Sequence, residues 1–253
     1  NNRNPFVDRP EYVWSVFMNQ ANDTRLTISG GTSDGNGGSN RNIDLGRIFV
    51  GSSVSTSANV ALNKTGNDGT YYEVATTGNA TSSISGSHHA FATGGSDASS
   101  LTVGLSGSTG VAGLLSGTVV IDNLDVTTGG GTGRGANDGN DVVNLSLTVV
   151  DHATASFSDL ERMTELAIDF GTIVHGQPSL SLPFEISNLA NGVSNLTANL
   201  DIDEIAATGD VSSLMTTLEI TDAANAIAGD ENREFMAILD PSNLGTLSAI
   251  YTL

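Results

Sequence analysis

The 253-residue sequence contains no cysteine, so no disulfide bond holds its fold together. It has one lysine, Lys64, and eight arginines against 28 acidic residues. The net charge of −19 argues against nucleic acid or an anionic membrane surface as a partner. No uninterrupted apolar run of about 18 residues occurs, so we predict no membrane span. These absences leave an acidic chain that depends on its own hydrophobic cores.

Aromatic residues make up only 5% of the chain and charged residues 15%, whereas there are thirty glycines among many serines, threonines and asparagines. Helices require more leucine, lysine, glutamate and arginine than this composition supplies. Short strands joined by generous turns fit it well. We therefore predict an all-β protein.

A nine-residue pattern occurs twice, as IDLGRIFVG at residues 43–51 and as IDFGTIVHG at residues 168–176. A spacing shared at identical internal positions indicates a repeated structural unit. Each copy is followed by apolar–polar alternation, which predicts strands, so we expect two tandem Ig-like β-sandwich domains. Aligned without gaps, the two alternations are one residue out of phase, which predicts a bulge or an insertion near the bend.

These patterns predict an N-terminal arm at residues 1–42, a first domain at 43–157 and a second domain at 158–253. Ser158 and Glu161 have the spacing of a helix N-terminus, which predicts a short helical linker at residues 158–165. In the first domain, we predict strands at 43–50, 54–62, 70–76, 79–85, 100–105, 117–126 and 142–150.

The second domain repeats this plan, with Phe235 matching Leu101 and Gly245 matching Gly117. Nothing in it corresponds to the first domain's closing strand at 142–150. We therefore expect the second domain to lack its last strand, which would expose an apolar groove and unpaired backbone groups.

Within the arm, residues 12–18 (YVWSVFM) are β-branched or aromatic on both alternation faces, which predicts a strand buried on both sides. Residues 25–29 predict a second strand, and the glycine-rich residues 30–42 predict a flexible linker. Through Arg47 the chain has five arginines and five acids, so the net charge comes from the remaining chain. The arm is therefore free to fill a groove, in its own first domain or in another subunit.

Several motifs resemble those of known families. Residues 168–176, followed by FEISN at 184–188, resemble choice-of-anchor and ASH-like Ig domains. The segments LNKTGNDGTYY at 62–72, DNLDVTT at 122–128 and GRGAND at 133–138 resemble exported bacterial proteins of the PEP-CTERM class. The resemblance covers residues 43–253 and implies a secreted or cell-surface β-sandwich protein without catalysis. The sorting segment typical of that class is missing from the sequence.

The only metal candidate is a weak Ca²⁺ site at Asn137, Asp138, Asn140 and Asp141, whose clustered oxygens suit a hard cation. An ordinary Asx-Gly turn explains the same residues. The four histidines show no zinc-binding spacing, and no nucleophile motif or phosphate-binding loop occurs. We therefore expect no enzymatic activity and, apart from possible Ca²⁺, no cofactor.

The sequence begins Asn1-Asn2-Arg3 and carries no leader, as a processed secreted chain would. We expect an extracellular structural protein that assembles head to tail with copies of itself into a surface fibre or coat by strand complementation. The expected interface joins two sets of residues: Tyr12, Trp14, Val16 and Met18 of the arm, and Ala249, Tyr251 and Leu253 of the second domain. The alternative is a monomeric surface adhesin or glycan-binding module.

Overall fold

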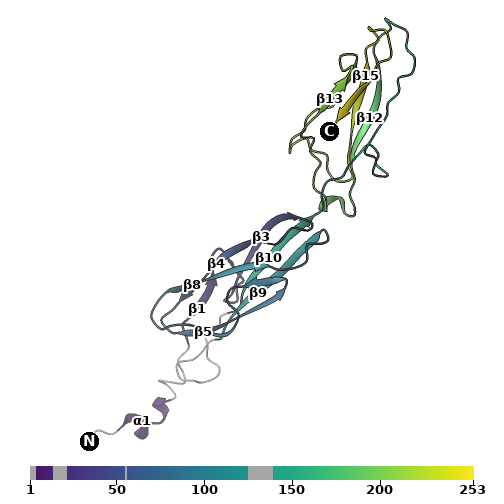
Figure 1. Cartoon of the computed structure of the whole chain (residues 1–253). Coiled ribbons are helices and arrows are strands. Elements are labelled where there is room, and N and C mark those ends of the chain that lie inside the picture. Colours follow the sequence, from purple (N-terminus) through teal and green to yellow (C-terminus); the bar gives the residue numbers. More distant parts are fainter. Residues whose placement is uncertain (1–3, 14–21, 55, 125–138) are drawn as a thin grey trace. The chain divides into compact units, whose positions relative to one another are not determined.

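The computed structural model describes residues 4–13, 22–54, 56–124 and 139–253, and the chain divides into two compact units. Unit 1 comprises Asn1–Thr109 and Leu114–Thr148, and unit 2 comprises Gly110–Gly113 and Val149–Leu253. Both units are built of β-strands (Figure 1), with one 3-10 turn, Ser194–Leu196, in the described part of unit 2. The all-β, Ig-like sandwich class predicted from composition and alternation is confirmed.

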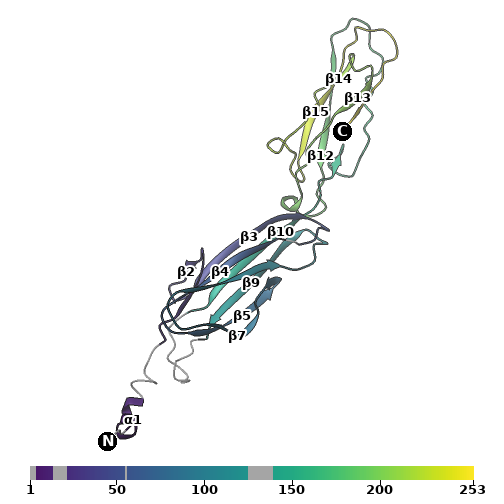
Figure 2. The ribbon, with the colours of Figure 1, turned by 60° about the vertical axis from the view of Figure 1, so that its left-hand side comes forward.

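Unit 1 is a sandwich of two sheets. The first contains, in order, β1 (Arg25–Ile28), β4 (Ser57–Thr65), β8 (Asp97–Leu105) and β6 (Ala80–Ser82). The order of the second, which Figure 2 shows, is β2 (Thr32–Ser33), β3 (Ser39–Phe49), β10 (Asp141–Val150), β9 (Gly113–Asn123), β5 (Thr70–Gly78) and β7 (Gly86–Phe91). All seven predicted strands are present, and β7, which lacks clear alternation, was not predicted.

The core of unit 1 lies between these sheets and follows the alternation of the strands. In β10, Val143, Leu145 and Leu147 are at most 2% exposed, and Val119 and Ile121 of the neighbouring β9 are equally buried. Each fully buried side chain of this size contributes about 1.5–3 kcal/mol. The closing strand β10 is therefore a central part of the unit 1 core.

Unit 2 has one comparable sheet and one much smaller sheet. The first contains, in order, β11 (Ala155–Ser156), β12 (Leu180–Asn188), β15 (Asn232–Leu239) and β14 (Leu214–Thr216). The second contains only β13 (Ala206–Gly209) and β16 (Ala249–Thr252). Its core of buried hydrophobic residues consists of Ile186, Ile202, Ile227 and Phe235.

The first sheets of the two units repeat strand by strand. Leu105 pairs with Ala80 in unit 1, and Leu239 pairs with Leu214 at the matching position in unit 2. Val60 pairs with Leu101, and Phe184 pairs with Phe235. On this alignment, Val60 lies nine positions after the motif glycine Gly51, and Phe184 lies eight positions after Gly176. This difference of one position agrees with the predicted bulge or insertion near the bend.

The second sheets repeat in part. Gly78 pairs with Gly117 between β5 and β9, and Gly209 pairs with Ala249 between β13 and β16. Both Gly78 and Gly209 have positive φ. The residue that corresponds to Gly117 is therefore Ala249, so the predicted match of Gly117 with Gly245 is wrong by four positions. Tyr251 then corresponds to Val119, and Leu253 corresponds to Ile121.

The repeated nine-residue motif has one local geometry in both units. Asp44 Oδ1 accepts a hydrogen bond from Gly46 N at 2.9 Å, and Asp169 Oδ1 accepts one from Gly171 N at 2.8 Å. Gly46 and Gly171 have φ values of 92° and 68°, in the left-handed region that glycine adopts without strain. The motif therefore encodes an Asp-stabilised kink.

The predicted arm requires a correction. The strand predicted at residues 25–29 is present as β1, which pairs with β4 and places Leu26 and Ile28 in the unit 1 core. Residues 30–42, predicted to be a flexible linker, instead contain β2 and the start of β3, which pair with each other. Glycine in this stretch serves tight turns between strands. Tyr12 lies in the short helix α2 (Glu11–Val13), which follows helix α1 (Pro5–Asp8), and not in a strand. Trp14, Val16 and Met18 lie outside the described residues.

The predicted helical linker at residues 158–165 is also wrong. Phe157 N donates to Met163 O at 2.9 Å, and Ser156 Oγ accepts a hydrogen bond from Met163 N at 2.9 Å. These bonds close a loop around the side chain of Ser156 and leave no helical turn. The preceding strand β11 belongs to unit 2, whereas the predicted boundary fell after residue 157. In the part of the chain described here, no helix is long and apolar enough to cross a membrane.

A candidate binding groove in the second unit

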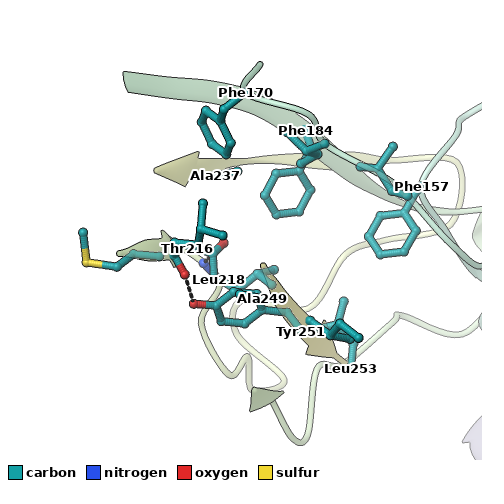
Figure 3. A pocket seen from close by; sticks show the side chains of 14 residues that line it. Phe157, Phe170, Phe184, Thr216, Leu218, Ala237, Ala249, Tyr251 and Leu253 are labelled. Atoms are coloured by element: carbon teal, nitrogen blue, oxygen red, sulfur yellow. Dashed lines mark hydrogen bonds between the residues drawn. The ribbon is translucent and has the colours of Figure 1, made fainter. Parts of the chain in front are cut away.

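Unit 2 contains an apolar hollow of about 230 Å³ (Figure 3). We call it the unit 2 groove. Phe157 and Phe184 line one wall, and their ring centroids lie 6.4 Å apart. Behind this wall, the ring centroid of the buried Phe235 lies 5.9 Å from that of Phe184. Phe157 follows β11 and Phe184 lies on β12, so the pairing of these two strands places the two rings close together. Phe170, from the second copy of the motif, adds another ring to the lining.

The opposite wall is strand β16. Ala249 and Tyr251 are half-buried and alternate with Ile250, which is 65% exposed. The phenol of Tyr251 donates a hydrogen bond to Leu214 O at 2.7 Å, which ties β16 to β14 in the other sheet. The structure thus brings together Ala249, Tyr251 and Leu253, the three predicted interface residues of this domain, in one lining.

A second hollow of about 940 Å³ shares Phe157, Leu166, Tyr251 and Leu253 with the lining of the first, and we call the two adjoining hollows together the trough. Residues 162–166 and residues 250–253 both line this part of the trough. Arg162, Glu165 and Asn191 make this part more polar than the first hollow. The sequence analysis did not predict these three polar residues or the aromatic lining of the trough. Four of the chain's eight phenylalanines lie in residues 157–235, which was a signal for an unusual core in the second unit.

One side of the trough is a chain segment without strand pairing. Residues 166–174 form no strand with any described part of the chain. Leu166 is 40% exposed and Val174 is 70% exposed. In unit 1 the corresponding residues belong to β3, whose Ile43, Leu45 and Ile48 pack against the core. Apolar side chains on a segment that pairs with no strand are typical of an edge that can accept a further strand.

The comparison with unit 1 explains the groove. There β10 lies between β3 and β9 in the sheet. Unit 2 contains the counterpart of β3 at residues 166–174 and the counterpart of β9 in β16, and no strand among its described residues lies between them. Ile121 of β9 is 1% exposed, whereas the corresponding Leu253 is 47% exposed. The unit 2 groove is therefore the place that β10 occupies in unit 1.

The residues predicted to bind Ca²⁺ are only partly described. Asn137 and Asp138 lie outside the described residues, and Asn140 is exposed. Asp141 is 1% exposed, and its Oδ1 accepts hydrogen bonds from the amide and the hydroxyl of Ser39. Asp141 therefore joins the start of β10 to the start of β3 and is unavailable to an exposed cation. The described residues contain no cluster of three or more metal-ligating side chains.

Of the predicted donor residues in the arm, only Tyr12 is described. Its side chain is 43% exposed, and the guanidinium carbon of Arg9 lies 5.9 Å from the centroid of its ring. Helices of four and three residues have little stability of their own. The described end of the arm therefore opposes a change to an extended conformation only weakly.

No family model matches the chain, and no curated protein sequence matches it. Among solved structures, it is similar to a protein of unknown function from Porphyromonas gingivalis W83, with 13% identity, coverage of 86% of this chain and 80% of that chain, and a TM-score of 0.33. It is also similar to the E. coli chaperone DraB, with 9% identity, coverage of 85% of this chain and 87% of that chain, and a TM-score of 0.32. A third similar structure is the Pseudomonas aeruginosa CupB2 chaperone, with 7% identity, coverage of 81% of this chain and 95% of that chain, and a TM-score of 0.27.

Proposed function

We propose that the protein is an extracellular structural subunit of a surface fibre or coat, assembled by strand complementation between copies. The observation that carries the proposal is the gap between residues 166–174 and β16, the place that β10 fills in unit 1. We further propose that the chain has no catalytic role. The resemblance to exported bacterial proteins supports the extracellular location.

The chemistry of the groove favours a β-strand as its occupant. The trough is lined largely by apolar side chains and bordered by residues 166–174 and by β16. An inserted strand would supply backbone hydrogen bonds to both segments and apolar side chains to the aromatic wall. A compact small ligand would leave residues 166–174 without a strand partner.

A second copy of this chain is the occupant that fits. Residues 12–18 carry apolar side chains at alternate positions, as β10 does. Burial of Tyr12, Trp14, Val16 and Met18 would contribute on the order of 6–10 kcal/mol before ordering costs. Residues 1–20 hold two arginines and two acids, so this donor segment avoids the repulsion that acidic surfaces exert on one another.

The location of donor and acceptor determines the form of the assembly. The donor segment lies in the N-terminal part of unit 1, whereas the acceptor groove is in unit 2, so the contact joins different surfaces of two identical copies. A contact of this kind produces an open filament unless its rotation closes a ring. Fibre growth therefore follows from the same contact that completes the fold of unit 2.

The test is a substitution that makes the donor segment polar. The variant Trp14→Asp with Val16→Asp should remain folded and fail to form fibres, because two carboxylates cannot enter an apolar groove without a large desolvation cost. A matched control, Val7→Asp with Gln20→Glu, adds the same charge to the arm outside residues 12–18 and should assemble. Negative-stain microscopy and sedimentation velocity measure assembly.

Two outcomes would contradict the proposal. Fibres of normal appearance from the Trp14→Asp, Val16→Asp variant would exclude this donor segment. Dispersed wild-type particles under all conditions would favour the alternative of a monomeric adhesin or glycan-binding module.

A further inference from the structure

We propose that the occupant strand enters unit 2 as an internal strand, paired on both sides, and that residues 166–174 become a β-strand only when the occupant is present. This inference rests on the proposed function and specifies how the groove recognises its partner. It distinguishes insertion into a sheet from addition of a strand to the outer edge of β16.

The lining of the trough supports insertion. Ile168 and Phe170 line the same hollow as Ala249 and Tyr251, so the two bordering segments face one occupant. A strand paired with β16 alone would leave the backbone of residues 166–174 without a partner. A strand between both segments restores the order β3–β10–β9 that closes unit 1.

Residues 166–174 already have the local conformation that this role requires. Asp169 and Gly171 form the same kink as Asp44 and Gly46, which lie within the paired strand β3. Ile168 and Phe170 are half-buried toward the groove, as Ile43 and Leu45 are half-buried toward the unit 1 core. What this segment lacks is therefore a neighbouring strand, so the occupant creates the pairing without remodelling the chain.

The alternation of β10 predicts which face of the occupant enters the groove. In β10, Val143, Leu145 and Leu147 face the core, whereas Asn144 is exposed on the other face. Within residues 12–18, one face carries Tyr12, Trp14, Val16 and Met18, and the other carries Val13, Ser15 and Phe17. Only the first face is apolar throughout, so we assign it to the groove and place Ser15 on the outer face.

Amide hydrogen exchange with a peptide tests this arrangement on the full chain. The acceptor is the non-assembling variant Trp14→Asp with Val16→Asp, and the probe is a peptide of residues 10–20 (PEYVWSVFMNQ). We expect the peptide to slow exchange by at least about tenfold in residues 166–174 and in residues 249–253, because both segments gain backbone hydrogen bonds. A peptide with Ser15→Asp should act in the same way, and a peptide with Trp14→Asp should have no effect.

The outcomes separate this inference from the proposed function. Slower exchange in residues 249–253 alone would overturn insertion while leaving strand donation intact. Binding of the Trp14→Asp peptide together with loss of binding by the Ser15→Asp peptide would overturn the assigned face. If none of the peptides slows exchange in unit 2, both the insertion and this donor segment are wrong.

Discussion

The two units share a strand plan and differ in how completely it is carried out. Among the described residues, unit 1 has a cluster of sixteen buried hydrophobic residues, whereas the corresponding cluster in unit 2 has four. Both units have a four-stranded sheet, and each has a matching strand pair in its second sheet. This pair is β5–β9, which includes Gly78, in unit 1 and β13–β16, which includes Gly209, in unit 2. The difference arises where β10 lies in unit 1, so one strand decides whether the sandwich is closed.

The two units bury different hydrogen-bond donors at one corresponding position. Lys64 and Asn188 occupy corresponding positions and are both buried. The Nζ of Lys64 donates to Gly66 O at 3.1 Å and to Gly95 O at 2.9 Å, whereas Asn188 Nδ2 donates to Ala198 O and Ile227 O, both at 2.9 Å. Each side chain satisfies carbonyls of loops that cross the end of its sheet. The repeat therefore preserves a buried donor.

The largest effect that separates the units should come from truncating their cores. Leu62→Ala removes a fully buried side chain and should lower the free energy of unfolding of unit 1 by about 2–5 kcal/mol. Phe184→Ala, at a half-buried position beside the open groove, should cost the unassembled chain only about 1–2 kcal/mol, because less area leaves a packed environment. Denaturant unfolding followed by amide exchange assigns each loss to its unit.

The same measurements on assembled protein test whether an occupied groove closes the core of unit 2. Occupation of the groove buries Phe184, so the cost of Phe184→Ala should rise toward that of Leu62→Ala in fibres. Equal costs for the two variants in the unassembled chain would contradict an open unit 2 core.

A smaller effect is expected from the corresponding buried donors. Lys64→Met and Asn188→Leu should each lower the stability of their own unit by about 1–3 kcal/mol, because buried carbonyls lose their partners. The neighbouring substitutions Thr65→Ala and Ser194→Ala, at exposed side chains, should change stability by less than about 0.5 kcal/mol. Thermal unfolding with unit-resolved amide exchange measures these changes. A stabilising Lys64→Met would mean that the buried ammonium costs more than its hydrogen bonds contribute.

Much of the fold could be predicted from the sequence because unit 1 alternates clearly. The run Val143, Leu145, Leu147 and Val149 predicts β10, and the repeated motif predicts the second unit. The groove could be predicted in outline because no segment of residues 158–253 matches β10. Its aromatic wall could not, because Phe157 reaches the groove through the pairing of β11 with β12, a contact between residues about thirty positions apart.

The start of unit 1 shows why local composition misleads. Residues 30–42 are rich in glycine and polar residues, which predicts a linker, yet they form the β2–β3 hairpin. Buried long-range bonds decide the outcome: Ser39 Oγ accepts from Ile28 N at 2.9 Å, and Ser39 N donates to Asp141 Oδ1 at 2.8 Å. Such pairings join residues up to 102 positions apart. No local pattern contains that information.

The smallest expected effect concerns the point where the arm meets unit 1. Asp23 Oδ1 accepts hydrogen bonds from the amides of Asp68 at 2.9 Å and Asn67 at 2.8 Å, and Asp68 Oδ2 accepts one from Asp23 N at 3.0 Å. The amide hydrogen bonds from Asp68 and then Asn67 lower the pKa of Asp23, because they favour its charged form. These bonds fasten the chain after the donor segment to the turn between β4 and β5.

A carboxyl group whose pKa is lower in the folded state stabilises the fold at pH values above its pKa in the unfolded state, which is about 4. That contribution is lost as the pH falls through the pKa of the folded state. Unit 1 should therefore lose stability below about pH 4, and Asp23→Asn should make unit 1 less stable at pH 7 while reducing the further loss in acid. Melting temperatures at pH 7 and pH 3, with amide exchange to assign unit 1, measure both effects. The control Asp34→Asn removes a carboxylate from the nearby β2–β3 turn, where Asp34 Oδ1 accepts from Asn36 N at 2.7 Å. If Asp23→Asn and Asp34→Asn gave the same acid dependence as the wild type, the hydrogen bonds of Asp23 would contribute nothing to the pH response. Attachment of the chain at this point would then rest on Asn22 Nδ2, which donates to Gly69 O, and on Thr24 Oγ1, which donates to Asp68 O.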